Sequence, residues 1–457
     1  MTTAATSPNV QQYRVVIAMP ESRRVLALRT TDGYHLPRVS VPRQTRPAQQ
    51  LRNAIRTKWN IEVLILELVM TDRGSPAYVI AELLSSPSNC DLTAISLYRI
   101  SDSDLPERER STVEDFLDGD VAGPFSRFGW LDKALHWIET ATGRRISSKA
   151  DIEQLNAGAA YSLVRFHTDD GTDYWMKATG EPNAHELLTT SLLSQISPAY
   201  LPELIAIKPE WNAWLMAGCG SPIPELPRDP FALIDLLGDA VESMAELQLK
   251  TIGQERTLLR SGAFDQRPDV LLAHSDTLFT YLDQCMQAQT STKAARLESK
   301  RLHELRRIFE KACMRLSILD LPNTVIHGDM SLANILRGNT HCQFIDWCET
   351  YIGNPLITLE HLLLLNPITD FDRKRFVDRA LRGRYGDVMS KVCDPAAMDS
   401  ASIYMPLVAA VSALYGRGDW LGTERCEQPN RKVFARTIAR HMDRAARSPT
   451  LQGALGI

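Results

Sequence analysis

Short apolar runs, in which hydrophobic and polar residues alternate, dominate the first half of the chain and are typical of β-strands. They predict strands over 13–18, 24–29, 62–70, 77–83, 162–167 and 174–178. A turn at Pro20 separates the first two runs and therefore predicts a hairpin, and a turn at Asp169 to Gly171 separates the last two. Between the runs, apolar residues at helical spacing predict helices over 47–59, 131–141 and 184–195.

From residue 230 onward the spacing of apolar residues becomes mainly helical. It predicts helices over 231–250 and 293–319 and several more after Pro355. One pair of short apolar strands interrupts them, at 335–336 and 343–346. Strands first and helices later predict an α+β protein, with a small β-rich lobe on a larger helical lobe.

The domain organisation follows from breaks in this pattern. Gly143 to Arg145 and Ser147 to Ser148 interrupt the periodicity and predict a linker over 143–151. We therefore expect one domain at 10–142, a β-rich lobe at 152–218 and a helical lobe at 219–447. A length of 457 residues agrees with this division, since a domain has roughly 100–200 residues.

Composition excludes several classes of protein. Hydrophobic residues make up 44% and charged residues 23%, which is typical of globular proteins, and the net charge of -4 does not favour nucleic-acid binding. The eight cysteines form no CxxC pair and no zinc-type spacing, which favours reduced thiols in a cytoplasmic protein over a disulfide framework. The first ten residues lack a signal-peptide pattern, and apolar runs such as 63–70 are too short to span a bilayer, so we expect no membrane partner.

The chemistry is concentrated in two nearby segments. Residues 325–337 read VIHGDMSLANILR, and residues 342–347 read CQFIDW. Phosphoryl transfer needs a carboxylate facing the substrate hydroxyl, and an amide oxygen and a second carboxylate holding Mg²⁺. Asp329, Asn334 and Asp346 supply these groups, and the predicted hairpin between them would bring all three into one cleft. For His327 we predict a structural role, bonding to backbone.

These segments resemble the catalytic loop and metal-binding motif of kinases. The variant His-Gly-Asp-x-x-x-x-Asn followed by Ile-Asp-Trp is similar to the aminoglycoside phosphotransferase and choline kinase group. The resemblance covers about residues 152–447 and implies a bilobal protein-kinase-like fold. It implies transfer of the γ-phosphoryl of ATP or GTP to a hydroxyl of a small molecule. Asp329 is then the catalytic residue, and Asn334 and Asp346 hold Mg²⁺.

The same resemblance implies a nucleotide site upstream. Lys177 closes an apolar strand and Glu186 follows nine residues later on the next predicted helix, so they match the lysine that binds phosphates and the carboxylate that steadies it. The loop over 155–162 stands where a glycine-rich loop would cover the phosphates. It contains only Gly158, although its backbone amides are still able to face phosphates, and a plain hairpin turn is the alternative.

A stretch resembling the hinge between kinase lobes gives the remaining predicted nucleotide contacts. Met216 and Gly218 are the implied lining residues, and Met216 would serve equally well as core. After the metal motif, the family often has a further Asp that is missing here. Glu360 either replaces it or has no part in the site. Glu349 is either an added metal ligand or a solvated turn acid.

The first block, 10–142, resembles a Nudix domain more faintly, which implies an α/β/α arrangement. No acidic residue occurs from Arg38 to Asn60, so Nudix-type pyrophosphate hydrolysis is not expected. That stretch is instead basic and holds Arg38, Arg43, Arg46, Arg52, Arg56 and Lys58. It is either a solvated face or a degenerate site for a phosphorylated ligand, a nucleotide or a partner that regulates the kinase, with Arg52 and Arg56 as the test positions.

Two further questions stay open at this level. The alternative to an enzyme is a nucleotide-binding pseudokinase that signals through the first block. A cationic acceptor would need an acidic pocket, for which Asp370, Asp372 and Asp378 are candidates that would equally suit the surface.

Overall fold

The computed structural model describes the chain except for residues 1–9, 43–45, 70–76, 86–90, 224 and 339. Arg43, Cys90 and the last residue of the predicted strand over 62–70 lie outside the described residues. The chain divides into two compact units. The strand-rich unit comprises Met1–Leu187 and Glu203–Gly218, and the helical unit comprises Leu188–Pro202 and Cys219–Ile457. This agrees with the predicted α+β class.

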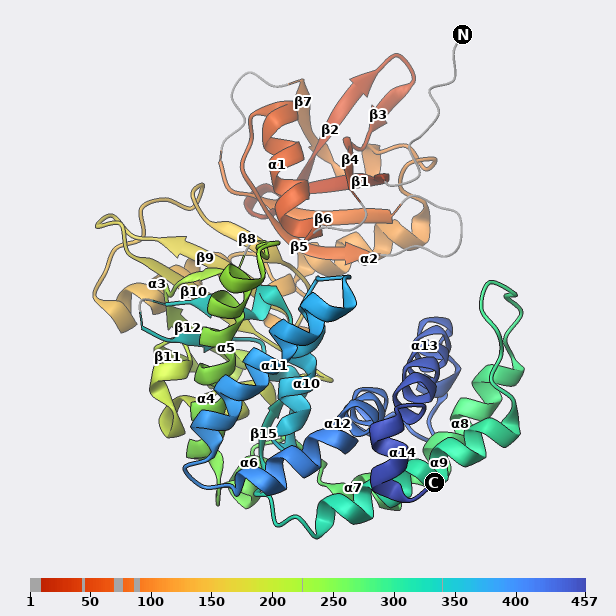
Figure 1. Ribbon diagram of the computed structural model, residues 1–457. Helices are drawn as coiled ribbons and strands as arrows, with labels where there is room; N and C mark the ends of the chain where they lie inside the picture. The colour runs from red at the N-terminus through yellow and green to blue at the C-terminus, as the bar shows by residue number, and fades with distance from the viewer. Residues whose placement is uncertain (1–9, 43–45, 70–76, 86–90, 224, 339) are drawn as a thin grey trace. The chain divides into compact units, whose positions relative to one another are not determined.

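The strand-rich unit begins with a seven-stranded mixed sheet. Its strands are β1 (Val10–Met19), β2 (Arg24–Thr30), β3 (Gly33–His35), β4 (Arg38–Pro42), β5 (Val63–Val69), β6 (Ala77–Leu83) and β7 (Leu92–Ser96). Helix α1 (Pro47–Trp59) packs on one face (Figure 1). Helices α2 (Glu107–Asp118) and α3 (Trp130–Thr142) pack on the other. The layers are therefore α/β/α, and the likeness to Nudix domains stays a prediction.

Helix α1 shows how the pattern becomes structure. Pro47 occupies the first turn, where its missing N–H costs nothing, and Asn60 ends the helix in the left-handed conformation. Leu51, Ile55 and Trp59 fall on one face and are buried against the sheet. The predicted bounds of this helix are confirmed.

A second sheet completes the strand-rich unit. It contains β8 (Glu153–Asn156), β9 (Ser162–His167), β10 (Asp173–Ala178), β11 (Leu204–Lys208) and β12 (Ala213–Ala217), in the order β11-β12-β10-β9-β8. Val164, Phe166 and Met176 point from one face into the same core as Leu66 of β5 and Trp130 of α3. The first block and the second sheet therefore share one hydrophobic core.

The segment over 143–151, predicted as a linker, is strapped to the β9–β10 hairpin. The backbone N–H of Ser147 donates to the carbonyl of His167 at 3.0 Å, and that of Asp169 donates to Arg145 at 3.1 Å. It contains no helix or strand, but its backbone is held in place. The predicted domain boundaries stay a prediction.

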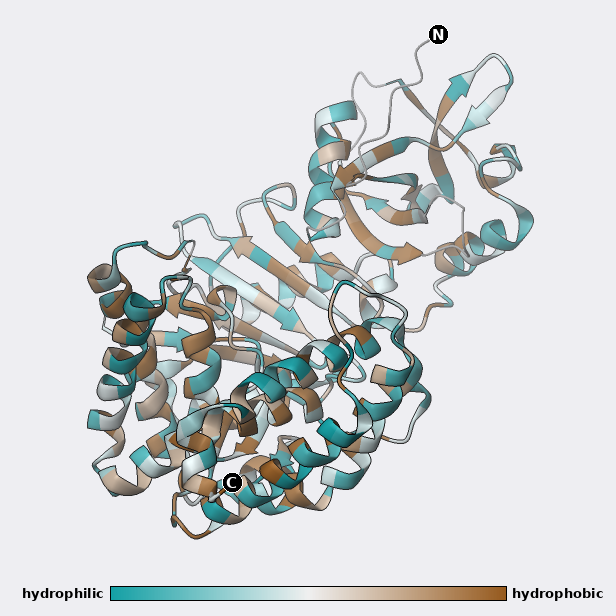
Figure 2. Ribbon diagram, turned by 45° about the vertical axis from the view of Figure 1, so that its right-hand side comes forward, coloured by the Kyte–Doolittle hydropathy of each residue, from teal (hydrophilic) through white to brown (hydrophobic). Residues whose placement is uncertain are grey.

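The helical unit is built around one large core. Its main helices are α5 (Pro230–Thr251), α6 (Glu255–Arg260), α7 (Pro268–Ala273), α8 (Ser275–Gln287), α9 (Ser299–Ser317), α10 (Leu356–Leu364), α11 (Phe371–Met389), α12 (Pro395–Tyr415), α13 (Pro429–Ala446) and α14 (Pro449–Leu455). Apolar and polar colours lie on different sides of many of these helices in Figure 2, as expected for helices around a core. The predicted helix over 293–319 begins later, at Ser299, although residues 293–298 are good helix formers. The carbonyls of Ala294 and Ala295 accept from the side chains of Gln289 and Arg440 instead.

Two small sheets lie within this unit and hold the segments of the predicted catalytic motif. One has the order β13-β16-β17, from β13 (Ser221–Pro222), β16 (Ile335–Arg337) and β17 (Cys342–Phe344). The other has the order β14-β18-β15, from β14 (Phe264–Gln266), β18 (Thr350–Gly353) and β15 (Thr324–His327). The predicted strand pair at 335–336 and 343–346 is present as β16 and β17.

Helix α12 is long and apolar enough to cross a membrane by length and composition alone, although sequence analysis singled out no such segment. Within the protein, 56% of its most apolar window is buried. The core helix of a soluble protein passes the same test, so α12 alone is weak evidence for a membrane span.

Candidate active site

His327 links the two halves of the predicted catalytic motif in the helical unit. It ends strand β15, is fully buried, and its Nε2 lies 2.9 Å from the carbonyl oxygen of Ile345. Its ring stands 4.5 Å from that of Trp347. Because Ile345 and Trp347 flank Asp346, His327 fixes the catalytic loop to the metal-motif segment. This is the backbone-bonding role predicted for it.

Residue 328 has to be glycine because the Tyr351 side chain fills the space that a Cβ would need. A Cβ on this residue would lie 2.3 Å from the Tyr351 ring and 2.9 Å from the carbonyl oxygen of Glu349. The N–H of Gly328 donates to the same carbonyl at 2.7 Å. The loop thus runs flat against β18, which sets the position of Asp329. Tyr351 was not singled out from the sequence, since a tyrosine in a short apolar strand is typical of core.

Asn334 is oriented by Asp329. It is 7% exposed, and its Nδ2 donates to the Asp329 backbone oxygen at 2.8 Å and to Asp329 Oδ2 at 3.3 Å. With the amide nitrogen committed, the amide oxygen is left to accept. The N–H of Ile345 donates to the Asn334 carbonyl at 3.1 Å, which ties the strand leading to Asp346 to the end of the loop. Asp329 itself is exposed to solvent.

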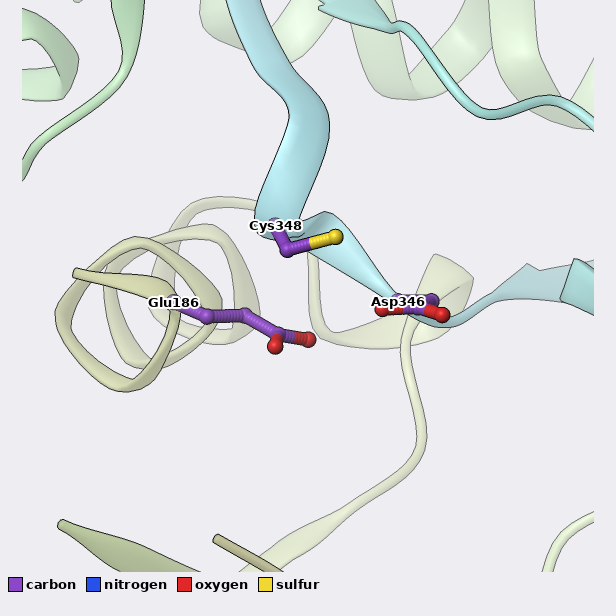
Figure 3. Close-up of side chains that lie close together, drawn as sticks. All are labelled: Glu186, Asp346 and Cys348. Carbon is purple, nitrogen blue, oxygen red and sulfur yellow. The ribbon is translucent and has the colours of Figure 1, made fainter. Parts of the chain in front are cut away.

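Asp346 sits in an unusual backbone conformation. Its φ of 68° and ψ of 62° lie in the left-handed region. Residues other than glycine rarely adopt this conformation, which costs them about 1–3 kcal/mol. Figure 3 shows the side chains of Asp346 and Cys348 on this segment, and that of Glu186 on α4. The hydrogen bond from Trp347 Nε1 to the carbonyl of Phe344, at 3.0 Å, holds the turn. Such local strain is concentrated at functional sites in proteins.

Glu349 braces the loop. It accepts a hydrogen bond from the Tyr351 hydroxyl, and burial raises the pKa of that hydroxyl well above its ordinary value, so it remains a donor. Burial also raises the pKa of the Glu349 carboxyl, against the opposing effects of Tyr351 and the Arg417 guanidinium. Its carboxylate is thus engaged with Tyr351, unlike a solvated turn acid.

Glu360, the predicted substitute for the family's missing Asp, pairs with a helix instead. Its Oε1 lies 2.6 Å from Nη2 of Arg382 on α11. Asn354, at the position where the family often has that Asp, accepts from the N–H of Leu356 at 3.0 Å and so helps to begin α10. Both residues therefore stabilise helices.

The strand-rich unit brings Lys177 and Glu186 together. Lys177 Nζ lies 2.5 Å from Glu186 Oε1, with side chains 18% and 1% exposed. Lys177 is on β10, and Glu186 begins α4 (Glu186–Ile196). The buried carboxylate of Glu186 thus holds the partly exposed ammonium of Lys177 in place.

Met216 lies on the same face of the sheet as Lys177. Side chains alternate along strands, and Met176 and Leu215 face the shared core, so Lys177, Trp214 and Met216 face the other way. There Leu187, Trp214 and Met216 form a small apolar cluster. Met216 is thus mostly buried, at 9% exposure, but outside the main core.

Gly218 and Gly158 have different structural reasons to be glycine. The N–H of Gly218 donates to the carbonyl of Asp173 at 2.7 Å, and a Cβ would lie 2.8 Å from that oxygen. Its amide is therefore already engaged. Gly158 has φ of 156° in the turn between β8 and β9, where its carbonyl accepts from the N–H of Tyr161 at 3.3 Å.

Arg52 and Arg56, the two test positions of the basic stretch, are engaged internally. Arg52 is 7% exposed, and its guanidinium donates to the carbonyls of Val63, at 2.7 Å, and Ile152, at 2.5 Å. Arg56 lies 2.8 Å from the carboxylate of Glu62. The predicted ligand-binding role of Arg52 is therefore not favoured, because its donors already join α1 to β5 and to the segment before β8.

Two more basic residues of this stretch also have partners. Arg38 pairs with Asp104, and Lys58 donates to the carbonyl of Arg38 at 2.9 Å.

A cavity of about 720 Å³ lies beside the catalytic loop within the helical unit. Its lining includes Leu332 from the loop, the acids Glu225 and Asp370, and the bases Arg228 and Arg373. Of the three acids considered for a cationic acceptor, Asp370 lines this cavity and caps α11. Asp378 accepts from Asn366 at 2.8 Å, and Asp372 is exposed. An acidic pocket is therefore not formed by these three residues.

Solved structures of low identity align with much of the chain. A macrolide 2′-phosphotransferase from Brachybacterium faecium is 13% identical, with 67% of this chain and 97% of that chain covered and a TM-score of 0.45. A choline/ethanolamine kinase family protein from Mesorhizobium loti is 14% identical, with 71% and 98% covered and a TM-score of 0.41. With TM-scores below 0.5, these are similarities alone. No curated protein matches the sequence.

The family comparison covers the segment with the catalytic motif. The match begins beyond Lys177 and Glu186 and contains Asp329, Asn334 and Asp346. It supports the phosphotransferase part of the predicted resemblance. Residues 191–392 match the model of the phosphotransferase enzyme family.

Proposed function

We propose that this chain is a Mg²⁺-dependent phosphotransferase that moves the γ-phosphoryl of ATP or GTP to a hydroxyl of a small molecule. The observation that carries the proposal is the pairing of Asn334 with Asp329. The amide nitrogen is held by the aspartate, so a neutral oxygen is left beside the segment that carries Asp346. The family match over residues 191–392 supports the same activity.

The residues of the helical unit have separate roles in this reaction. Asp329, exposed on a fixed loop, accepts or orients the proton of the acceptor hydroxyl. The oxygens of Asn334 and Asp346 are the hard donors that Mg²⁺ prefers and would hold it. When bound, Mg²⁺ neutralises charge on the phosphates. His327 and Gly328 keep these side chains in place, which matters because phosphoryl transfer depends mainly on positioning.

The nucleotide site would draw on the strand-rich unit. Lys177, steadied by Glu186, supplies positive charge for phosphate oxygens. The apolar cluster of Leu187, Trp214 and Met216 on the same face of the sheet gives a surface suited to a flat base. The Gly218 amide is not part of base recognition in this proposal, since it is bonded to Asp173.

We take the cavity beside Leu332 as the place of the acceptor in this proposal. It carries two acids and two arginines, so a polycation has no advantage there over a neutral or zwitterionic alcohol. A useful panel of acceptors therefore contains neutral, zwitterionic and cationic alcohols, including aminocyclitols.

The test is nucleotide consumption by the full chain with Mg²⁺ across this panel, with ATP and GTP compared. Asp329→Asn should lower acceptor-dependent turnover by about 10²–10⁴-fold, the usual contribution of a positioned acid or base, while nucleotide binding is retained. The matched control is Asp372→Asn, which changes an exposed acid on α11 and should leave turnover unchanged.

Two outcomes would contradict the proposal. Equal turnover by wild type and Asp329→Asn would remove the catalytic role of Asp329. Tight nucleotide binding without turnover of any acceptor would favour the nucleotide-binding regulatory alternative.

A further inference from the structure

The turn between β8 and β9, residues 157–161, lies in the loop that the kinase resemblance places over the nucleotide phosphates, and the inference below rests on the proposed function. Glycine-rich loops wrap phosphates because glycine backbones adapt freely. This loop has one glycine, Gly158, followed by Ala159, Ala160 and Tyr161. A loop with so little freedom has to be held in the right shape by its surroundings.

The first block holds the loop from one side. The N–H of Phe125 donates to the carbonyl oxygen of Ala159 at 3.2 Å. Gly123 is packed against the same group, because a Cβ there would stand 2.0 Å from the Ala159 oxygen. The neighbouring Ser126 hydroxyl donates to Glu67 Oε2 at 3.1 Å, and Glu67 Oε1 is 4.0 Å from where a Cβ on Gly158 would be.

A second segment holds the loop from its own sheet. The Tyr161 hydroxyl donates to the carbonyl of Gly180 at 3.0 Å. A Cβ on Gly180 would lie 2.3 Å from the Cβ of Ala160, so that glycine also permits a close approach. The loop is therefore fixed at consecutive residues, Ala159, Ala160 and Tyr161.

These contacts also set the direction of the loop amides. A trans peptide unit carries its C=O and N–H on opposite sides. Since the Ala159 carbonyl faces Phe125, the N–H of Ala160 in the same peptide unit points away from the first block. Within the described part of the chain, the N–H groups of Ala159 and Ala160 donate to no residue. They are left as donors for an anion.

The support behind the loop is firmly anchored. Gln154 of β8 exchanges two hydrogen bonds with the backbone of Ile65 on β5, at 2.9 Å and 2.7 Å. Arg52 adds a bond to Ile152, and the shared core packs beneath. A movement of the first block is therefore transmitted to the strand that begins the loop.

We infer that residues 123–126 of the first block are positioning residues for the nucleotide loop. They hold its peptide groups in the shape that receives phosphate, so the loop needs few glycines. The first block is accordingly part of the nucleotide site. Fixing the donors in advance lowers the entropic cost of binding, which is how preorganisation raises affinity.

The test uses the full chain carrying Gly123→Ala, whose new methyl displaces the Ala159 carbonyl. We expect the affinity for ATP with Mg²⁺ to fall at least about 10-fold, the cost of roughly one lost charge-assisted hydrogen bond. The affinity for adenosine, which lacks phosphates, should be unchanged. Hydrogen exchange at the Tyr161 amide, which donates to the carbonyl of Gly158, should accelerate. Gly383→Ala, on α11 with no atom within 4 Å of the new methyl, is the matched control.

The outcomes separate this inference from the proposed function. If wild type binds no nucleotide, the proposed function fails and the inference fails with it. If wild type binds but Gly123→Ala binds as well as Gly383→Ala does, the inference alone is overturned. Should Gly123→Ala not fold, Ser126→Ala removes the bond to Glu67 and leaves the backbone packing intact. A smaller loss for ATP but not adenosine would then support the inference, and no loss would overturn it.

Discussion

The two loops with proposed roles in phosphoryl transfer are held in place differently. The catalytic loop, from His327 to Asn334, is fixed by the segment that follows it in the chain, through Ile345, Glu349 and Tyr351. The nucleotide loop, 157–161, is fixed in part by Phe125, from a separate layer of the fold. When the residues that support a loop are close to it in the sequence, loop and support together form a short recognisable motif. When the supporting residues are far away in the sequence, no such motif is formed.

Gly328→Ala tests most directly whether local packing fixes the catalytic loop. The added methyl would meet both the Tyr351 ring and the Glu349 carbonyl, so the catalytic loop has to move. A displacement of about 1 Å at a reacting group costs about 10²-fold in rate, and we expect kcat to fall by that amount with little change in nucleotide affinity. Steady-state kinetics and nucleotide titration measure the two effects separately.

A double variant checks the cause. Gly328→Ala combined with Tyr351→Ala removes the ring but not the Glu349 carbonyl, so only part of the lost rate should return. An unchanged kcat in Gly328→Ala itself would show that local packing does not fix the catalytic loop.

The distant support is tested by comparing two arginines one helical turn apart on α1. Arg52→Ala leaves the buried carbonyls of Val63 and Ile152 without their donor, and should lower the free energy of unfolding by on the order of 3 kcal/mol. Arg56→Ala removes an ion pair whose arginine is 57% exposed, and should cost less than about 1 kcal/mol. Denaturant titrations of the full chain give both values, and equal losses would contradict the structural role of Arg52.

The smallest expected effect concerns Glu82, which accepts from the N–H of Gly129 just beyond the loop-supporting segment. Burial raises its pKa, so the folded state binds the proton more tightly than the unfolded state does. The free energy of unfolding therefore falls as pH rises through the ordinary value of about 4.3 and then the folded value. In Glu82→Gln the free energy of unfolding should not fall in this way, because glutamine does not titrate.

We accordingly expect the difference in Tm, variant minus wild type, to be more positive at pH 8 than at pH 4. A difference that does not change with pH would show that Glu82 titrates alike in both states.

The periodic spacing of apolar residues predicted the helices and strands in which buried and exposed residues alternate regularly. Helix α1 and strands β6 and β9 have the predicted bounds, and the short β16–β17 hairpin joins the two halves of the catalytic motif. Strand β8 was missed, because Glu153 to Asn156 lacks the β-branched residues typical of strands and is extended only through its pairing with β9.

The candidate site was only partly accessible from sequence. The positions of Asp329, Asn334 and Asp346 follow from one motif, whereas the bracing by Tyr351 and the engagement of Arg52 depend on contacts with other elements. The sequence alone does not reveal whether a given arginine contacts solvent, a ligand or a buried carbonyl.

The strand order of the second sheet has a consequence for synthesis of the chain. Strand β12 lies between β10 and β11, yet it leaves the ribosome after both. Until Ala217 emerges, the nascent chain carries β10 with one bare edge, and bare edges pair readily with other chains. A translational pause before β12 would therefore release an aggregation-prone intermediate. A pause just beyond Gly218 would instead leave β12 available to pair with β10 and β11.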